Sequence, residues 1–290
     1  MPRLRRRSVL SFLFRAGTYL ALLLVLSPAV WLLVGVVRKA APHWKWSVLW
    51  TPLKGTSGGL LGPLLGTLIL MAGVLVLAGT VGVLAGIHLA ELSRARRSGR
   101  AGGGVLRTAS DVLSGFPSIV LGFVGYVALV IGLHWGYSLL PALIIVSIMV
   151  VPYIAKTTET ALRQVPTAYR EGAEALGMSM GYGLRKVVLK SALPGIVTGL
   201  LIALAIAGGE TAPLIYTAGW STSVWTGSFT GGHQFGYLTY MVFTFWDDPS
   251  KNAQYLSYDA ALVLVVLVLI LLVAARVVVA RTQRHSDLHP

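Results

Sequence analysis

The sequence predicts an all-α, polytopic membrane protein with six transmembrane helices. Hydrophobic residues make up 55% of the 290-residue chain and charged residues only 12%, whereas soluble domains carry about 25% charged residues. Six apolar segments could cross about 30 Å of hydrocarbon, which takes about 20 helical residues. We place the six spans at residues 17–37, 62–90, 116–133, 139–153, 195–216 and 259–279. The fourth span, 139–153, is short unless it continues to about residue 162.

The lysines and arginines are divided unevenly between the two sides of these spans. With the N-terminus in the cytoplasm, 19 of the 24 Lys and Arg residues lie on the cytoplasmic side. Loops rich in Lys and Arg stay in the cytoplasm, so both termini are expected on the cytoplasmic side. The membrane is expected to be a bacterial cytoplasmic (inner) membrane. Membrane lipid then explains the net charge of +14, and no nucleic acid is expected as a partner. The five residues on the other side are Arg38, Lys39, Lys45, Lys54 and Lys251.

The ends of the chain are expected to be short cytoplasmic tails, residues 1–16 and 282–290, on either side of a transmembrane domain at 17–281. The apolar run after MPRLRRR is longer than the core of a signal peptide, so we expect it to remain as the first span. The chain has no cysteine and no G-x-x-x-x-G-K-[ST] motif. Thiol chemistry and ATP hydrolysis by a P-loop are therefore excluded, and we expect no cofactor and no metal.

The longest polar interval between apolar segments is at residues 165–194, on the cytoplasmic side. Pro166 suits the first position of a helix, and Gly177 suits the position after a helix end. We therefore predict one short helix between them and a second, separate helix at about residues 182–193. Small residues at 172, 173 and 175 would let another surface approach closely. An ordinary cytoplasmic loop is the simpler interpretation.

Glu171-Gly172-Ala173, followed by Gly177, resembles the EAA loop of ABC-importer permeases. In that family the loop is a coupling helix that sits in a cleft of the ATPase subunit. The resemblance implies a type I ABC-importer permease fold, with the EAA loop at residues 165–194. It assigns ATPase coupling to Arg170, Glu171, Gly172, Ala173 and Gly177. The family usually has alanine at the position of Gly172.

The third span opens with the sequence GFPSIVLG at residues 115–122. Gly115 and Pro117 weaken a helix, and Ser118 can satisfy the backbone groups that are freed. A simple proline kink is the alternative. The segment resembles a signature of phosphate-importer permeases, as does the glycine-rich segment at residues 55–67.

The fifth span contains GGETAPL at residues 208–214. A charged carboxyl inside a membrane helix costs about 2.5–3.5 kcal/mol, which indicates a functional site. Broken helices at membrane depth line cavities. We therefore predict a translocation pathway at Glu210, Thr211, Pro213 and Gly209, with Gly115, Pro117 and Ser118 from the third span. In the structural alternative, Glu210 is protonated and bonds to a neighbouring helix.

GETAPL, followed by an aromatic residue and Thr-Ala, resembles the fifth-span signature of PstA-type permeases of the bacterial phosphate ABC importer. The resemblance implies transport of inorganic phosphate and no enzymatic activity on this chain. It also implies a second permease subunit of the PstC type, two ATP-binding subunits and an extracytoplasmic phosphate-binding protein. The family usually has arginine four residues before the glutamate, where this chain has Ile206. An importer for molybdate, tungstate or sulfate therefore stays open.

Two other classes of function are compatible with a chain of this composition. A proton-coupled secondary transporter could use Glu210 and would need no ATPase. An intramembrane enzyme would need paired acids or a histidine cluster at membrane depth, and the spans offer only one deep acidic group.

Two further local structures are expected. Glu159 and Arg163 are spaced for an i,i+4 ion pair. The aromatic segment at residues 234–246 predicts an interfacial helix or a re-entrant lid.

Overall fold

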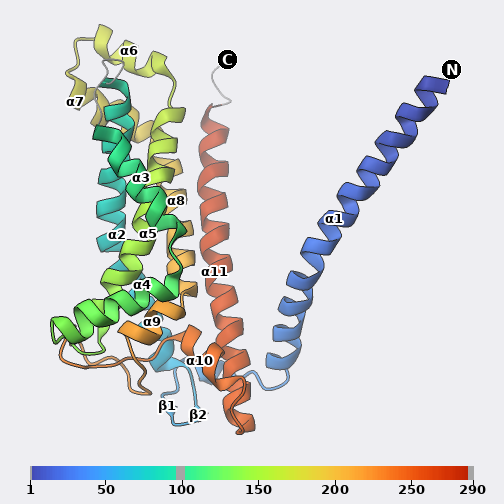
Figure 1. Ribbon diagram of the computed structural model, residues 1–290, viewed down its shortest axis with the longest axis vertical. Helices are drawn as coiled ribbons and strands as arrows, with labels where there is room; N and C mark the ends of the chain where they lie inside the picture. The colour runs from blue at the N-terminus through green and yellow to red at the C-terminus, as the bar shows by residue number, and fades with distance from the viewer. Residues whose placement is uncertain (1, 96–101, 287–290) are drawn as a thin grey trace. The chain divides into compact units, whose positions relative to one another are not determined.

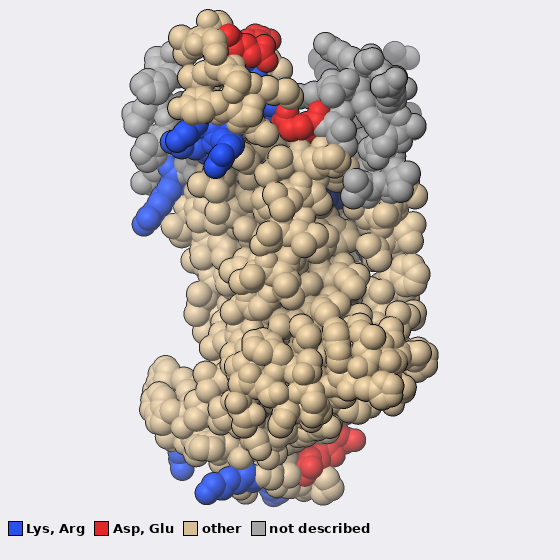
Figure 2. Space-filling view, turned by 90° about the vertical axis from the view of Figure 1, so that its left-hand side faces the viewer, with Lys and Arg blue, Asp and Glu red and all other residues tan. Residues whose placement is uncertain are grey.

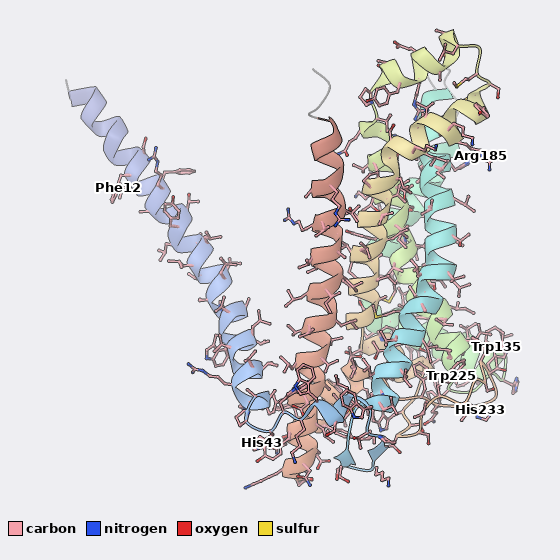
Figure 3. All side chains as sticks on the ribbon, turned by 180° about the vertical axis from the view of Figure 1, so that it is seen from behind. Phe12, His43, Trp135, Arg185, Trp225 and His233 are labelled. Atoms are coloured by element: carbon pink, nitrogen blue, oxygen red, sulfur yellow. The ribbon has the colours of Figure 1, made fainter. Side chains whose placement is uncertain are left out.

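The computed structural model describes residues 2–95 and 102–286, which fall into two units divided between Lys45 and Trp46. The first unit contains one long helix, α1 (Pro2–Ala40). Its apolar side chains are exposed, as Phe12 is at 70% (Figure 3). From Ser11 onward α1 is long and apolar enough to cross a membrane, and an exposed apolar surface suits contact with lipid.

The second unit is a bundle of long helices whose axes are roughly aligned (Figure 1). They are α2 (Leu61–Ala95), α5 (Leu139–Gln164), α11 (Lys251–Ser286) and a helix from Met180 to Gly209. With α1 they make the five described helices that could cross a membrane by length and composition. On the face shown in Figure 2, charged side chains gather at the two ends and the band between them is uncharged.

The centre of the bundle is the contact between α2 and α5. Leu70, Val74 and Ala78 of α2 are buried in one core cluster with Val146 and Val150 of α5. Glycines let the two helices approach closely, as small residues do in membrane interfaces. A Cβ added at Gly82 would lie only 2.7 Å from the Cβ of Ile154. Further along the same side of α2, Gly86 contacts Thr158 of α5.

The third predicted span differs from the structure. The helix does not run from residue 116 to 133: α3 (Gly102–Gly115) ends, and α4 (Ser118–Gly125) begins after Pro117. Pro117 has ψ 130°, and the residue before a proline avoids the helical conformation. α4 then lies across the bundle and leads into the π-helix η3 (Tyr126–Gly132) (Figure 1). By contrast, the fourth span continues through α5 to Gln164.

Short elements lie at the end of the bundle opposite α6 (Thr167–Ala175) and α7 (Met180–Gly183) (Figure 1). They include η1 (Trp46–Leu49), α9 (Ala212–Thr217), α10 (Leu238–Phe245) and a hairpin of β1 (Leu53–Lys54) and β2 (Ser57–Gly58). Trp135, Trp225 and His233 lie at this end, away from Arg185 (Figure 3). The helix expected within residues 234–246 is confirmed as α10, which packs against α11.

Candidate functional site

The first candidate site is the EAA loop, which opens with the short helix α6 (Thr167–Ala175). Pro166 is the N-cap, with ψ 141°, rather than the first helical residue. At the other end Gly177 has φ 72°, a conformation that favours glycine, and its N–H donates to the carbonyl of Glu174 at 2.9 Å. The predicted stop is therefore confirmed, and the predicted start is one residue too early.

The second short helix of the EAA loop is not separate. α7 (Met180–Gly183), the π-helix η4 (Leu184–Val188) and α8 (Leu189–Gly209) form one continuous helix. The predicted end near residue 193 is wrong because Pro194 lies inside α8. Proline is tolerated in membrane helices, where neighbouring groups satisfy the freed backbone carbonyl.

The five residues predicted to couple to an ATPase point in two directions. Glu171, Gly172 and Gly177 are exposed, and no described atom lies within 4 Å of a Cβ added at Gly172. Ala173 is buried at 6%, where a Cβ added at Gly183 would lie 3.4 Å from its own Cβ. Only part of the set is therefore free to meet another protein, and Ala173 holds the loop against itself.

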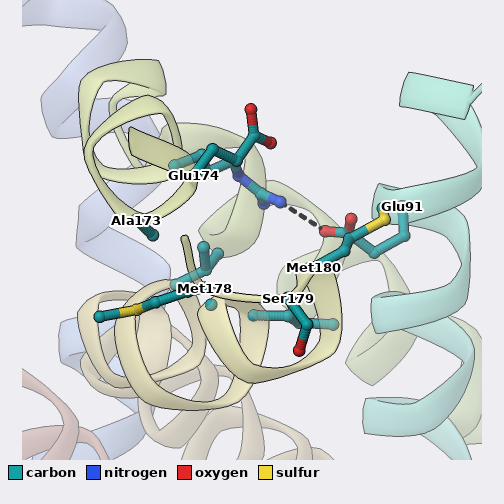
Figure 4. A pocket seen from close by; sticks show the side chains of 10 residues that line it. Glu91, Ala173, Glu174, Met178, Ser179 and Met180 are labelled. Carbon is teal, nitrogen blue, oxygen red and sulfur yellow. Dashed lines mark hydrogen bonds and ion pairs between the residues drawn. The ribbon is translucent and has the colours of Figure 1, made fainter. Parts of the chain in front are cut away.

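Arg170 is also turned toward the bundle: it contacts Glu91 near the C-terminal end of α2, and the dashed line in Figure 4 ends on this glutamate. Its Nη1 donates to Oε1 of Glu91 at 2.9 Å, and the two side chains are 13% and 16% exposed. The remaining buried polar atoms of this pair, Nε of Arg170 and Oε2 of Glu91, have no hydrogen-bond partner among the described residues. Both side chains line a pocket of about 270 Å³ beneath α6. Glu91 could not be selected from the sequence, where its only signal is a carboxylate near the end of a span.

The second candidate site is the break in the fifth span. α8 ends at Gly209, Glu210 is extended with ψ 135°, and α9 starts at Ala212, which confirms the predicted loosening of the helix. The carbonyl of Glu210 accepts a hydrogen bond from the Thr239 hydroxyl at 2.8 Å. Its carboxylate makes no hydrogen bond or ion pair with residues 2–95 or 102–286. One turn earlier, Ile206 is 40% exposed.

The two glycine- and proline-rich signatures meet at this break. A Cβ added at Gly122 of α4 would lie 2.6 Å from the Cα of Pro213 in α9. One turn further, a Cβ at Gly125 would lie 3.0 Å from Cγ2 of Thr217. The contact therefore uses Gly122 and Gly125. Gly115 and Pro117 are exposed and Ser118 is half-buried, and no described atom lies within 4 Å of a Cβ added at Gly115.

Comparison with known proteins identifies the class of this molecule. Residues 78–284 match the family described as "binding-protein-dependent transport system inner membrane component". The chain is 50% identical to the phosphate transport system permease protein PstA 2 of Mycobacterium bovis, over 98% of this chain and 92% of that protein. It is 33% identical to the PstA protein of Xylella fastidiosa, over 80% and 79% of the two chains. The chain belongs to the PstA family of ABC-transporter permeases.

Family membership fixes the general role. As a PstA-family permease, the chain is a multi-pass component of the inner membrane and not itself an enzyme. The fold agrees with that of an inward-facing structure of the MetNI methionine ABC transporter, with a TM-score of 0.55 and 22% identity over 76% of this chain and 96% of that one. The all-α ABC-importer permease fold predicted from the sequence is therefore confirmed. Permeases of this family work in complexes with other ABC-transporter components.

A further link joins the two candidate sites. Near the N-terminal end of α2, the hydroxyl oxygen of Thr67 accepts the backbone N–H of Leu238 at 2.9 Å. The next residue, Thr239, is the one that donates to the carbonyl of Glu210. Helix α2 therefore contacts the EAA loop through Glu91 and is tied near its other end to the break at Glu210. Neither threonine could be selected from the sequence, because the partner that links it to the break lies far away in the chain.

Proposed function

We propose that this chain carries inorganic phosphate across the cytoplasmic membrane and is driven by ATPase subunits that bind the exposed face of α6. The observation that carries this proposal is that the residues of α6 form two sets, one turned toward the bundle and one exposed. Ala173 and Arg170 hold the helix against the bundle, which leaves Glu171 and Gly172 exposed. An exposed, fixed helix with small residues suits docking into a cleft. The PstA names of its relatives support phosphate as the cargo.

The proposed topology has six crossings with both termini in the cytoplasm. Five are the long helices α1, α2, α5, the helix from Met180 to Gly209, and α11. The remaining crossing is the broken run from α3 to η3, which leads from the α6 end of the bundle to the opposite end (Figure 1). In this arrangement the EAA loop is on the cytoplasmic side, with 19 of the 24 Lys and Arg residues.

The translocation pathway is proposed to pass the break at Gly209, Glu210, Thr211 and Pro213, with the segment around Gly115, Pro117 and Ser118 beside it. Glu210 suits this role because no described residue satisfies its carboxylate. With Ile206 at the family's arginine position, the fifth span has no basic residue. The positive charge for the anion then comes from a second permease subunit of the PstC type.

The proposed complex also contains two ATP-binding subunits and an extracytoplasmic phosphate-binding protein. Closure of the ATPases on ATP would move α6 and rock the helices between outward- and inward-facing states. Arg170, Glu171, Gly172, Ala173 and Gly177 are the coupling residues in this account. Two of them act by holding the loop and three by facing the ATPase.

The proposal is tested by uptake of labelled phosphate at low external concentration in cells with and without this chain. Unlabelled sulfate, molybdate and tungstate serve as competitors. They are included because Ile206 stands where the family usually has arginine, which makes another oxyanion the second candidate substrate. We expect phosphate uptake to require the chain and to resist all three competitors. Phosphate uptake that does not require the chain, or that one of the three competitors abolishes, would show that phosphate is the wrong substrate.

A further inference from the structure

We infer that Glu91 is a positioning residue for the EAA loop: its ion pair with Arg170 fastens α6 to α2, so that α2 moves when α6 is displaced. This inference rests on the proposed function, because it assumes that force enters through α6. The pair joins residues 79 positions apart in the sequence. It therefore ties two separate elements rather than two turns of one helix.

The packing of α6 gives the ion pair its importance. α6 packs against α7 and η4, which are the start of the helix that continues as α8. Force on α6 therefore reaches α8 through apolar packing such as Ala173 against Gly183. Among the described residues, the polar contact that connects α6 to α2 is the 2.9 Å ion pair between Arg170 and Glu91.

The space beneath α6 is incompletely filled. The pocket of about 270 Å³ lies between α6, α7 and the end of α2, and Met178 and Met180 are among its lining residues (Figure 4). Methionine is flexible and specifies a position weakly. A charge pair that is mostly shielded from water is stronger and less screened by salt than a surface pair. The position of α6 over α2 therefore depends on the charges more than on shape.

Helix α2 can transmit a displacement because it is one continuous helix of 35 residues. It is closely packed against α5 at Gly82 and Gly86. Near its other end, Thr67 holds the N–H of Leu238, beside the threonine that bonds the carbonyl of Glu210. Fastening α6 to Glu91 thus connects the ATPase-facing helix to the break in the fifth span.

The test separates coupling from stability. The purified complex, with its ATPase subunits and binding protein, is placed in proteoliposomes, and phosphate uptake and ATP hydrolysis are measured together. We expect Glu91→Gln and Arg170→Gln to assemble and hydrolyse ATP, while phosphate moved per ATP falls about tenfold, within the usual range of coupling between sites. The charge swap, Glu91→Arg with Arg170→Glu, should restore most of the ratio.

A matched control removes an ion pair that joins no separate elements. Glu159 and Arg163 pair at 2.7 Å within α5, so Arg163→Gln should leave phosphate moved per ATP unchanged. If the Glu91 and Arg170 variants lose hydrolysis and transport in equal proportion, the pair is only structural and the inference is wrong. If the wild-type complex moves no phosphate, the proposed function has failed instead.

A second variant tests the inference without relying on the swap. The natural chain has no cysteine, so Glu91→Cys with Arg170→Cys can be bridged selectively by a short bifunctional thiol reagent. Before bridging, the double variant should be poorly coupled, and bridging should restore transport. If bridging instead blocks transport of a coupled variant, residues 91 and 170 must separate during the cycle, which would overturn the inference.

Discussion

The two ends of the bundle are held together in different ways. At the EAA loop, one charged pair and a few small apolar contacts hold α6 above an incompletely filled pocket. At the break in the fifth span, backbone packs on backbone, with Gly122 against Pro213 and the carbonyl of Glu210 held by Thr239. The first arrangement leaves a surface free to dock and to move. The second fixes a backbone shape that the helix would not adopt alone.

The strongest test of this difference is Gly122→Leu. The added side chain would begin 2.6 Å from the Cα of Pro213, so one of the two backbones must shift. We expect transport to be abolished and stability to fall by about 1–3 kcal/mol, as for overpacked cores. Uptake and thermal unfolding of the purified protein provide the measurement. Gly79→Ala is the control, because its Cβ would be at an ordinary 3.4 Å from Leu200. Normal uptake by Gly122→Leu would show that α4 and α9 do not need this contact.

At the EAA loop, Gly172→Trp should abolish transport with no loss of stability. No described atom lies within 4 Å of a Cβ added at Gly172, so the new side chain begins in open space. A loss of transport is then expected to come from a partner that needs this space. Capture of the ATPase subunit by the tagged permease should fall together with uptake. Normal capture and uptake would mean that this face of α6 does not enter a cleft.

Glu210→Gln should lower phosphate uptake about tenfold, a change of about 1.4 kcal/mol, and leave thermal stability unchanged. The reason is that its carboxylate has no partner among the described residues, so the amide removes charge without breaking a contact. Uptake and unfolding are measured on the same preparation. Unchanged uptake would favour the alternative in which Glu210 is protonated and structural.

Thr239→Val should have a smaller effect, mainly on stability. It removes the hydroxyl that donates to the Glu210 carbonyl at 2.8 Å, and a hydrogen bond of this kind contributes about 1 kcal/mol. Unfolding in detergent measures the loss. Thr80→Val is the control, because its hydroxyl bonds only within its own helix, to Val76. Equal stability of the two variants would show that the break does not depend on Thr239.

The smallest expected effect is that of Gly172→Ala. Alanine fits the open position and raises helix propensity, so α6 should gain about 0.5–1 kcal/mol. Transport should stay normal, because the family usually has alanine there. A large loss of uptake would mean that the ATPase cleft of this complex requires glycine.

Much of the fold could be predicted because local residues decide it. Gly177 ends α6, and Gly209 and Glu210 mark the break in the fifth span. The i,i+4 pair of Glu159 and Arg163 also forms as expected. In each case the residues that determine the structure are within a few positions of one another, so their spacing carries the information.

The parts that could not be predicted depend on contacts between distant segments. Pro194 could not be recognised as an internal helix residue, because its surroundings in the membrane decide whether the helix continues. Likewise, nothing near Glu91 indicates Arg170, and nothing near Gly122 indicates Pro213. The division of α6 into inward and outward residues required knowledge of what lies beneath it.

The most direct test of the central claim is phosphate uptake into proteoliposomes that contain the complete complex and its binding protein. Uptake is measured with ATP on the ATPase side, and separately with an imposed proton gradient and no ATP. We expect uptake that requires ATP and is lost in Gly172→Trp. Uptake driven by the proton gradient alone would contradict this expectation and identify a secondary transporter that uses Glu210.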